Sequence, residues 1–250
     1  MLRNAVRRAV NRLGYDVHRI SKPEFRWVSE IELRMGTVTM AIPPLLQEHV
    51  DGAVLYADRV RALEALPRGG VVAEIGVALG DFSQAMLTYL APCRFDAFDL
   101  FQLHEAQSLW GRSSAEWFGG LSHRTQYEHR FADEIAAGKL RIHEGDSSRE
   151  MDKQPDSSYD VIYIDGDHSY EAARRDAEVS ARKLKADGVL IFNDYIIFDY
   201  LGGVPYGVVP VVHELCVSRG WRVSFFALAN NLYCDIALRR QPNQFIGPPQ

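Results

Sequence analysis

The chain has 250 residues, of which 47% are hydrophobic and 24% charged, with a net charge of −5 and a pI near 5.9. This composition is typical of a globular protein, and the length fits one α/β domain with additions or two small domains. The negative charge gives no general electrostatic basis for nucleic-acid binding, so we expect no nucleic-acid partner. No apolar run reaches the length of a membrane span, and the first twenty residues lack the apolar core of a signal peptide.

Cysteine usage indicates a reducing environment. Cys93, Cys216 and Cys234 lie far apart, and no C-x-x-C pair occurs. A sparse, odd number of cysteines argues against a disulfide framework and against a zinc knuckle. We therefore expect a cytoplasmic protein.

The N-terminal segment carries a separate pattern. Residues 1–45 are predicted to be an extension that begins with a basic amphipathic helix over residues 1–13. Leu2, Val6, Ala9, Val10 and Leu13 recur at helical spacing, with arginines mostly on the other side. Such a helix binds an anionic membrane surface, a partner protein or a second copy of the chain. The alternative is a surface helix that packs on its own domain. Residues 46–240 are the expected main domain, and residues 241–250 a tail.

The main domain is predicted to start with a helix over residues 50–66, which carries an apolar stripe. Short strands and helices then alternate. Strands are expected over 71–75, 94–100, 140–143, 159–164 and 189–192. Helices are expected from Asp81, as the cap, to Leu90 and over 169–184 and 208–219. Residues 102–137 are polar and are predicted to be irregular. Two final strands, over 222–227 and 232–238, form an antiparallel hairpin.

This order predicts an α/β fold with a mostly parallel sheet, in which a ligand binds beyond the carboxyl ends of the strands. The first strand is followed by Gly76 and Gly80, which let a ligand approach the backbone closely. Asp99 follows the second strand and is placed to hold ribose hydroxyls. The third strand is followed by Asp146 and Ser147, which are placed near an adenine edge.

The fourth and fifth strands end in a different kind of set. Asp165 follows the fourth strand, and Asn193 and Asp194 follow the fifth. Neighbouring parallel strands lie about 4.8 Å apart, so these oxygens are within reach of one ion. An all-oxygen set is suited to Mg²⁺. His168 lies three residues beyond Asp165 and is close enough to act on a bound substrate. The alternatives are that the Asp-Gly and Asn-Asp pairs are turns and that His168 caps the helix after it.

These motifs together resemble a known family. Glu74-Ile75-Gly76-x-x-x-Gly80, Phe98-Asp99-Leu100-Phe101, Gly145-Asp146, Ile164-Asp165-Gly166-Asp167-His168-Ser169-Tyr170 and Gly188-Val189-Leu190-Ile191-Phe192-Asn193-Asp194-Tyr195 occur in that order. They look like the class I S-adenosylmethionine (SAM) methyltransferases grouped with macrocin O-methyltransferase, over about residues 50–240. That family has a Rossmann-like, seven-stranded, mostly parallel sheet with a C-terminal antiparallel hairpin, to which this chain adds a helical N-terminal extension.

The resemblance implies SAM and Mg²⁺ as cofactors and a small-molecule or glycan hydroxyl as the methyl acceptor. It implies that Asp165, Asn193 and Asp194 hold the metal and that His168, with Asp165, is catalytic. The implied cofactor-binding residues are Glu74, Gly76, Gly80, Ser83, Asp99, Asp146, Ser147 and Asp165. Asn193 departs from the family, whose members usually carry two acids at this place.

The acceptor is expected to contact residues 102–135, which include Trp110, Trp117, His104, His123, Arg124 and His129, with Tyr195 and Tyr206 at the entrance. The alternative for this segment is an ordinary lid packed on the core. Three other functions stay open. They are a catechol- or phenol-type O-methyltransferase, an NAD-dependent oxidoreductase, and a degenerate methyltransferase fold that serves as a scaffold in glycan assembly.

Overall fold

The structure, a computed structural model, describes residues 31–35 and 38–241 of the chain. Its centre is an eight-stranded sheet with the order β3-β13-β14-β10-β9-β4-β5-β8. Strand β14 is antiparallel to both β10 and β13, and the other neighbouring strands are parallel. The strands are β3 (Val54–Tyr56), β4 (Val71–Ile75), β5 (Arg94–Asp99), β8 (Leu140–Glu144), β9 (Tyr159–Ile164), β10 (Leu184–Phe192), β13 (Trp221–Ala227) and β14 (Asp235–Arg240).

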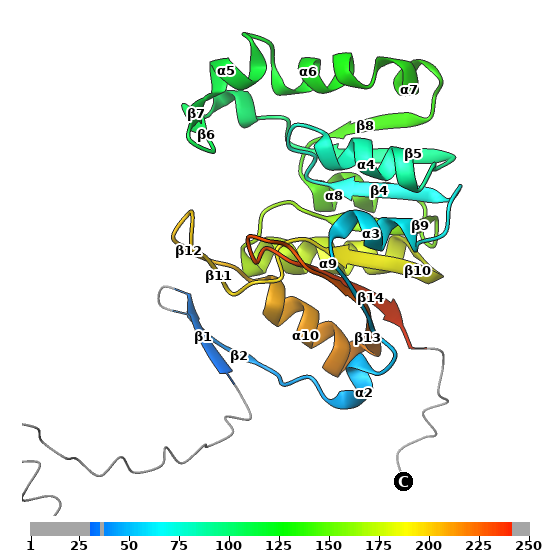
Figure 1. Cartoon of the computed structure of the whole chain (residues 1–250), viewed down its shortest axis with the longest axis vertical. Coiled ribbons are helices and arrows are strands. Elements are labelled where there is room, and N and C mark those ends of the chain that lie inside the picture. The colour runs from blue at the N-terminus through cyan, green and yellow to red at the C-terminus, as the bar shows by residue number, and fades with distance from the viewer. Residues whose placement is uncertain (1–30, 36–37, 242–250) are drawn as a thin grey trace, which may run out of the picture.

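Helices cover both faces of this sheet (Figure 1). One face packs on α8 (Ser147–Asp152), α9 (Tyr170–Lys183) and α10 (Val208–Arg219), and the other on α3 (Arg59–Glu64), α4 (Asp81–Tyr89), α6 (His123–Arg130) and α7 (Ala132–Ala136). In β9, Ile162 and Ile164 face the first core, whereas Val161 and Tyr163 face the second. Burial on both faces explains why this strand is apolar nearly throughout.

Three short antiparallel hairpins accompany the sheet. They are β1 (Ile31–Met35) with β2 (Val38–Ile42), β6 (Ser108–Leu109) with β7 (Arg112–Ser113), and β11 (Phe198–Asp199) with β12 (Val204–Pro205). All three lie at the same side of the molecule in Figure 1. The remaining elements are α2 (Gln47–Val50), the 3-10 helix η1 (Leu103–Glu105) and α5 (Ser114–Phe118). In the part of the chain that is described, no helix has the length and apolar character needed to cross a membrane.

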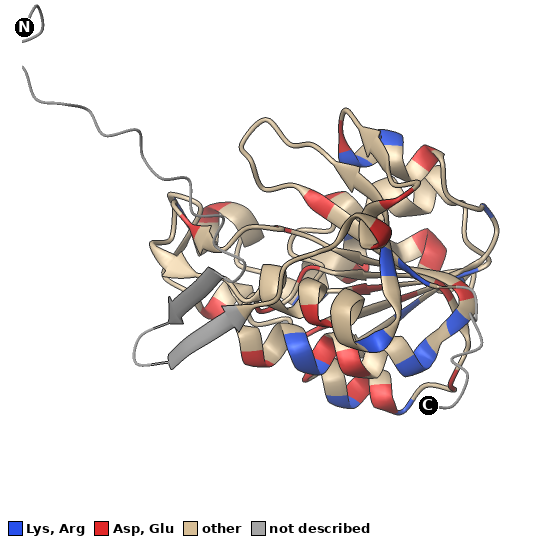
Figure 2. Ribbon diagram, turned by 90° about the horizontal axis from the view of Figure 1, so that it is seen from below, with Lys and Arg blue, Asp and Glu red and all other residues tan. Residues whose placement is uncertain are grey.

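Both basic and acidic residues occur along the helices of the described region, as the blue and red segments of Figure 2 show. The basic amphipathic helix predicted for residues 1–13 lies outside the described residues. Of the predicted extension, the structure describes the β1–β2 hairpin and the short connection that follows it.

The prediction of one helix over residues 50–66 is wrong. The segment divides into the end of α2, strand β3 and helix α3. Residues 54–56 pair in parallel with residues 225–227 of β13 and so add an eighth strand at the edge of the expected seven. Val54 and Leu55 are 48% and 65% exposed, so the apolar stripe that suggested a helix there is not a buried helix face.

Three further predictions need correction. Residues 102–137 are largely helical, with η1, α5, α6 and α7, and not irregular. The N-cap of α4 is Gly80 in a left-handed conformation, so Asp81 lies in the first turn and pairs with Arg130 instead of capping. Strand β10 begins at Leu184, directly after α9, and so includes five residues that precede the strand predicted over 189–192. The C-terminal hairpin and α10 lie where the sequence predicts them.

Candidate active site

A cleft of about 1300 Å³ opens at the carboxyl ends of the central strands. Its wall includes Gly76, Asp99, Ser147, Asp165 and Asn193, which lie at or just after the ends of β4, β5, β8, β9 and β10 in turn. The topology therefore brings together the five strand ends that the sequence singled out. A pocket for one drug-sized ligand usually measures about 300–1,000 Å³, so this cleft is larger than such a pocket.

Gly76 makes the floor of the cleft possible. Its φ is +80°, and a Cβ at this position would lie 2.0 Å from the backbone oxygen of Asp165. The Gly76 amide donates to the Phe98 carbonyl, and the Asp165 amide donates to the Ile75 carbonyl. The turn after β4 is thus threaded between the ends of β5 and β9, and only glycine fits there.

Asp99 is fixed by the backbone on both of its carboxylate oxygens. Oδ2 accepts from the Val77 amide at 2.8 Å and Oδ1 from the Phe101 amide at 2.6 Å. These bonds orient the carboxylate beside the glycine turn, within the cleft wall. The position is the one expected for an acid that holds ribose hydroxyls.

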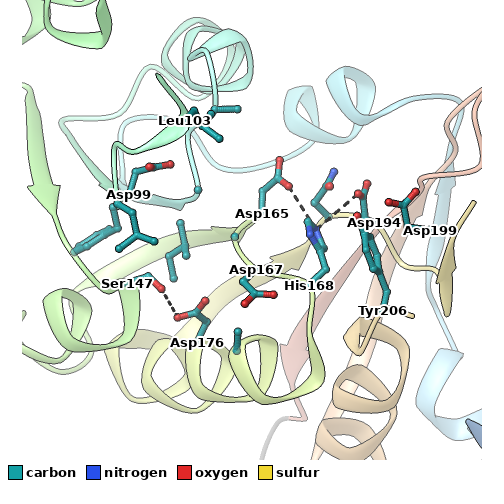
Figure 3. A pocket seen from close by; sticks show the side chains of 18 of the residues that line it. Asp99, Leu103, Ser147, Asp165, Asp167, His168, Asp176, Asp194, Asp199 and Tyr206 are labelled. Atoms are coloured by element: carbon teal, nitrogen blue, oxygen red, sulfur yellow. Dashed lines mark hydrogen bonds and ion pairs between the residues drawn. The ribbon is translucent and has the colours of Figure 1, made fainter. Parts of the chain in front are cut away.

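Asp146 and Ser147 start α8 at the neighbouring part of the wall. Asp146 is the N-cap, and its side chain accepts from the Arg149 amide. The Ser147 hydroxyl donates to Oδ1 of Asp176 at 2.7 Å, as Figure 3 shows. Asp176 is buried, and that burial raises its pKa to about 6. The sequence reading missed Asp176, whose place on the inner face of α9 gives no distinct local signal.

Three of the predicted cofactor-binding residues lie behind the cleft wall. Glu74 is 1% exposed and accepts a hydrogen bond from the Ser83 hydroxyl, which accepts one from Tyr127 at 3.0 Å. A Cβ on Gly80 would lie 2.7 Å from the Phe131 ring. These residues therefore pack behind the turn after β4 and do not face the cleft.

Asp165, His168 and Asp194 converge at the other half of the cleft (Figure 3). The Nε2 atom of His168 lies 3.6 Å from Oδ1 of Asp165 and 3.7 Å from Oδ2 of Asp194. That nitrogen is buried and has no hydrogen-bond partner in the described structure. Ser169, not His168, is the N-cap of α9.

Burial disfavours the charged forms of the side chains in this cluster. Burial, and then the Asp194 carboxylate, raise the pKa of Asp165 well above its usual value. Burial raises the pKa of Asp194 to about 6 and lowers that of His168 to about 4. Asp194 also has a φ of +53°, which is strained for a residue with a side chain and is typical of functional sites.

Asn193 belongs to a buried network behind these residues. Its Nδ2 donates to the Tyr163 hydroxyl at 3.0 Å and to Oδ1 of Asp235 at 3.1 Å. Arg59 lies 3.6 Å from Asp235 and lines the cleft. Burial lowers the pKa of Arg59, but Tyr163, Asp235 and the cleft carboxylates together outweigh it, so the pKa is raised. The sequence did not indicate Arg59 as a site residue, because residues 50–66 were predicted to form one helix.

The predicted acceptor segment lines the cleft only through its first part. Gln102, Leu103, Ala106, Trp110 and Gly111 are in the wall. His104, Trp117, His123, Arg124 and His129 are not, and His123, for example, contacts the Ala78 carbonyl. The facing wall comes from segments that the sequence reading left out, with Asp199, Leu201, Gly202, Asn231 and Tyr233. Tyr206 lines the cleft as predicted, whereas Tyr195 turns away and bonds His213.

Within residues 31–35 and 38–241, no group of three or more His, Cys, Asp or Glu side chains is arranged to hold a metal ion. Any ion at the cleft would therefore depend on the two carboxylates, Asp165 and Asp194, with an amide, water or substrate supplying the other oxygens. Incomplete protein ligation of this kind is usual for Mg²⁺.

Comparisons with known proteins found a matching family and similar solved structures. Residues 73–195 match a family described as "Methyltransferase domain". No curated protein matches the chain. Among solved structures, a Corynebacterium glutamicum protein is similar, with 12% identity, a TM-score of 0.52, and coverage of 80% of this chain and 88% of that one. An O-methyltransferase family protein from Burkholderia thailandensis has 14% identity, a TM-score of 0.49, and coverage of 74% and 56%.

Proposed function

We propose that this chain, whose residues 73–195 match a methyltransferase domain, uses SAM to methylate a hydroxyl oxygen of a sugar, glycan or natural-product acceptor with the help of Mg²⁺. One observation carries the proposal. Asp165, His168 and Asp194 meet around a buried, unpaired imidazole nitrogen in the same cleft as the glycine turn and Asp99. An oxygen nucleophile needs a base and a positioning device at such a place.

The residues fit Mg²⁺ in their chemistry. Asp165 and Asp194 offer hard carboxylate oxygens, and burial raises the pKa of both, so a bound cation would favour their charged forms. The Asn193 amide nitrogen is committed to Tyr163 and Asp235, which leaves Oδ1 as its one atom able to bind a cation. When bound, Mg²⁺ would lower the pKa of an alcohol hydroxyl and orient it.

His168 is the proposed base. Burial lowers its pKa to about 4, so the imidazole is neutral near pH 7 and has a lone pair to accept a proton. The Nε2 atom faces the two carboxylates and has no other partner. We assign it the proton from the acceptor hydroxyl as the oxygen attacks the methyl carbon.

The other half of the cleft is proposed to bind SAM, which supplies an electrophilic methyl group. Asp99 holds the ribose hydroxyls through the lone pairs that the Val77 and Phe101 amides leave free. Asp146 and Ser147 lie at the adenine edge, and the absence of a Cβ at Gly76 lets the cofactor lie against the backbone. The enzyme's contribution is then mainly alignment of the oxygen with the methyl carbon.

The test is a methyl-transfer assay with radiolabelled SAM on three vicinal diols, namely methyl β-D-glucopyranoside, methyl α-L-rhamnopyranoside and catechol, with Mg²⁺ or with EDTA. We expect transfer that EDTA abolishes and that Asp165→Asn or Asp194→Asn reduces on the order of 100-fold or more. His168→Gln should slow turnover and leave SAM affinity intact. Asp133→Asn, an exposed acid on α7, is the matched control.

Each outcome has a distinct meaning. Transfer to catechol alone would indicate a phenolic acceptor. Transfer that survives EDTA and both aspartate substitutions would reject the metal and keep O-methylation. Calorimetry with Mg²⁺ alone gives a second readout, since the binding heat should disappear in Asp165→Asn. Binding of SAM without transfer to any oxygen acceptor would favour the scaffold alternative.

A further inference from the structure

One face of the His168 imidazole is covered by an aromatic ring. The Tyr206 ring lies parallel to it, with centroids 4.5 Å apart and an interplanar angle of 8°. Tyr206 follows β12 and lines the cleft, as Figure 3 shows. A stacked neighbour fixes the plane of an imidazole and leaves its edge open. That edge is where Nε2 meets Asp165 and Asp194.

The backbone next to Tyr206 is tied to the same histidine. The Gly207 amide donates to the His168 carbonyl at 2.7 Å. A Cβ on Gly207 would lie 2.1 Å from Cα of Tyr170. The backbone at Gly207 is therefore in close contact with the start of α9, and a larger residue would not fit there. His168 is therefore held twice by one short segment, once through its backbone and once through its ring.

The β11–β12 hairpin holds Tyr206 in place from the other side. The Tyr206 amide donates to the Ile197 carbonyl at 3.0 Å across the base of the hairpin. Asp199 accepts from the amides of Leu201 and Gly202, both at 2.9 Å, and from the Tyr233 hydroxyl of the loop before β14. The ring that stacks on His168 is thus carried by a closed and anchored loop.

We propose that Tyr206 is a positioning residue that sets the plane of the His168 imidazole, so that Nε2 points to the place between Asp165 and Asp194. The inference rests on the proposed role of His168 as the base. The aromatic ring is the active part of Tyr206, and its hydroxyl is dispensable for this purpose. A wrongly turned imidazole would misplace the base by about 1 Å or more, which can cost about 100-fold in rate.

The first test is a nuclear magnetic resonance measurement of the His168 ring signals, assigned with His168→Gln. The Tyr206 ring current should shift these signals. Tyr206→Leu should abolish that shift and Tyr206→Phe should retain it. Phe198→Leu is the matched control, because Phe198 is an exposed aromatic residue of the same hairpin outside the cleft wall. Unchanged His168 signals in Tyr206→Leu would overturn the proposal.

The second test separates positioning from mere structure. With an acceptor from the panel above, Tyr206→Leu should lower kcat on the order of 10- to 100-fold with SAM affinity unchanged. Tyr206→Phe should restore most of it. Equal losses in both variants would assign the effect to the hydroxyl and reject the proposal. If the unaltered protein transfers no methyl group, the proposed function fails, while the ring signals still decide whether Tyr206 fixes His168.

Discussion

At the scale of single residues, Gly76 and Gly69 offer a matched comparison. Both have φ near +80°, but a Cβ on Gly76 would meet backbone at 2.0 Å whereas one on Gly69 would meet nothing within 4 Å. Gly69→Ala should cost only the left-handed conformation, about 1–2 kcal/mol. Gly76→Ala should cost clearly more, because β4 and β9 must separate, and it should also lose SAM binding.

Urea unfolding of the two glycine variants measures the difference, with SAM calorimetry as the second readout. Equal losses of stability would show that the contact between Gly76 and the Asp165 carbonyl is not as close as described.

Glu74 makes a pH-dependent contribution to stability. Burial raises its pKa from 4.5 to about 8, so it is protonated in the folded protein over a range in which the unfolded chain has released the proton. Stability from this group is complete below about pH 4.5 and is lost as pH rises to about 8, at about 1.4 kcal/mol for each pH unit. Glu74→Gln can still accept from the Ser83 hydroxyl and has no proton to lose.

The free energy of unfolding of Glu74→Gln, relative to the unaltered protein, should therefore rise steadily from pH 5 to pH 8. The comparison cancels the raised carboxylates of the cleft, which titrate in both proteins. A constant difference over this range would mean that Glu74 is ionised in the folded state.

At the scale of elements, the β11–β12 hairpin depends on one carboxylate. Asp199 accepts from two amides within the hairpin and from Tyr233 outside it, and these bonds hold its pKa below the usual value. Asp199→Ala should free the hairpin and speed hydrogen exchange at the Leu201 and Gly202 amides. Asp187→Ala, an exposed acid of β10, is the control. Unchanged exchange would show that the β-ladder alone closes the hairpin.

Elements also show where sequence reasoning stops. Buried strands such as β9 and helices with long apolar stripes such as α9 and α10 are predicted well, because their patterns are local. Strand β3 exists through its pairing with β13, some 170 residues away, and no local pattern records that contact. The short helices α5 and α6 did carry a signal, since Ser113 with Glu116 and Ser122 provide N-caps, but their apolar periodicity is weak.

At the scale of the whole molecule, the site residues that could be predicted from the sequence are those at the ends of the parallel strands. Residues at or directly after strand ends, such as Gly76, Asp99 and Asp165, reach the cleft because parallel strands end at one edge. Arg59, Asp176 and Asn231 reach it through tertiary packing of helices and distant loops, so their positions in the sequence give no comparable indication. The metal and cofactor roles assigned to the strand-end residues stay predictions.

The cleft joins the two halves of the sheet, so a ligand there should stabilise the entire fold. The turn after β4 contacts β5 and β9, and the two apolar cores meet across these strands. S-adenosylhomocysteine at 100 times its dissociation constant should add about 2.7 kcal/mol. For a chain of 250 residues this amounts to roughly 5–10 °C in Tm. Thermal unfolding followed by circular dichroism measures the shift, with NAD at the same concentration as the control. A shift with NAD alone would replace the methyl donor with a nicotinamide cofactor, because stabilisation follows whichever ligand the folded cleft binds.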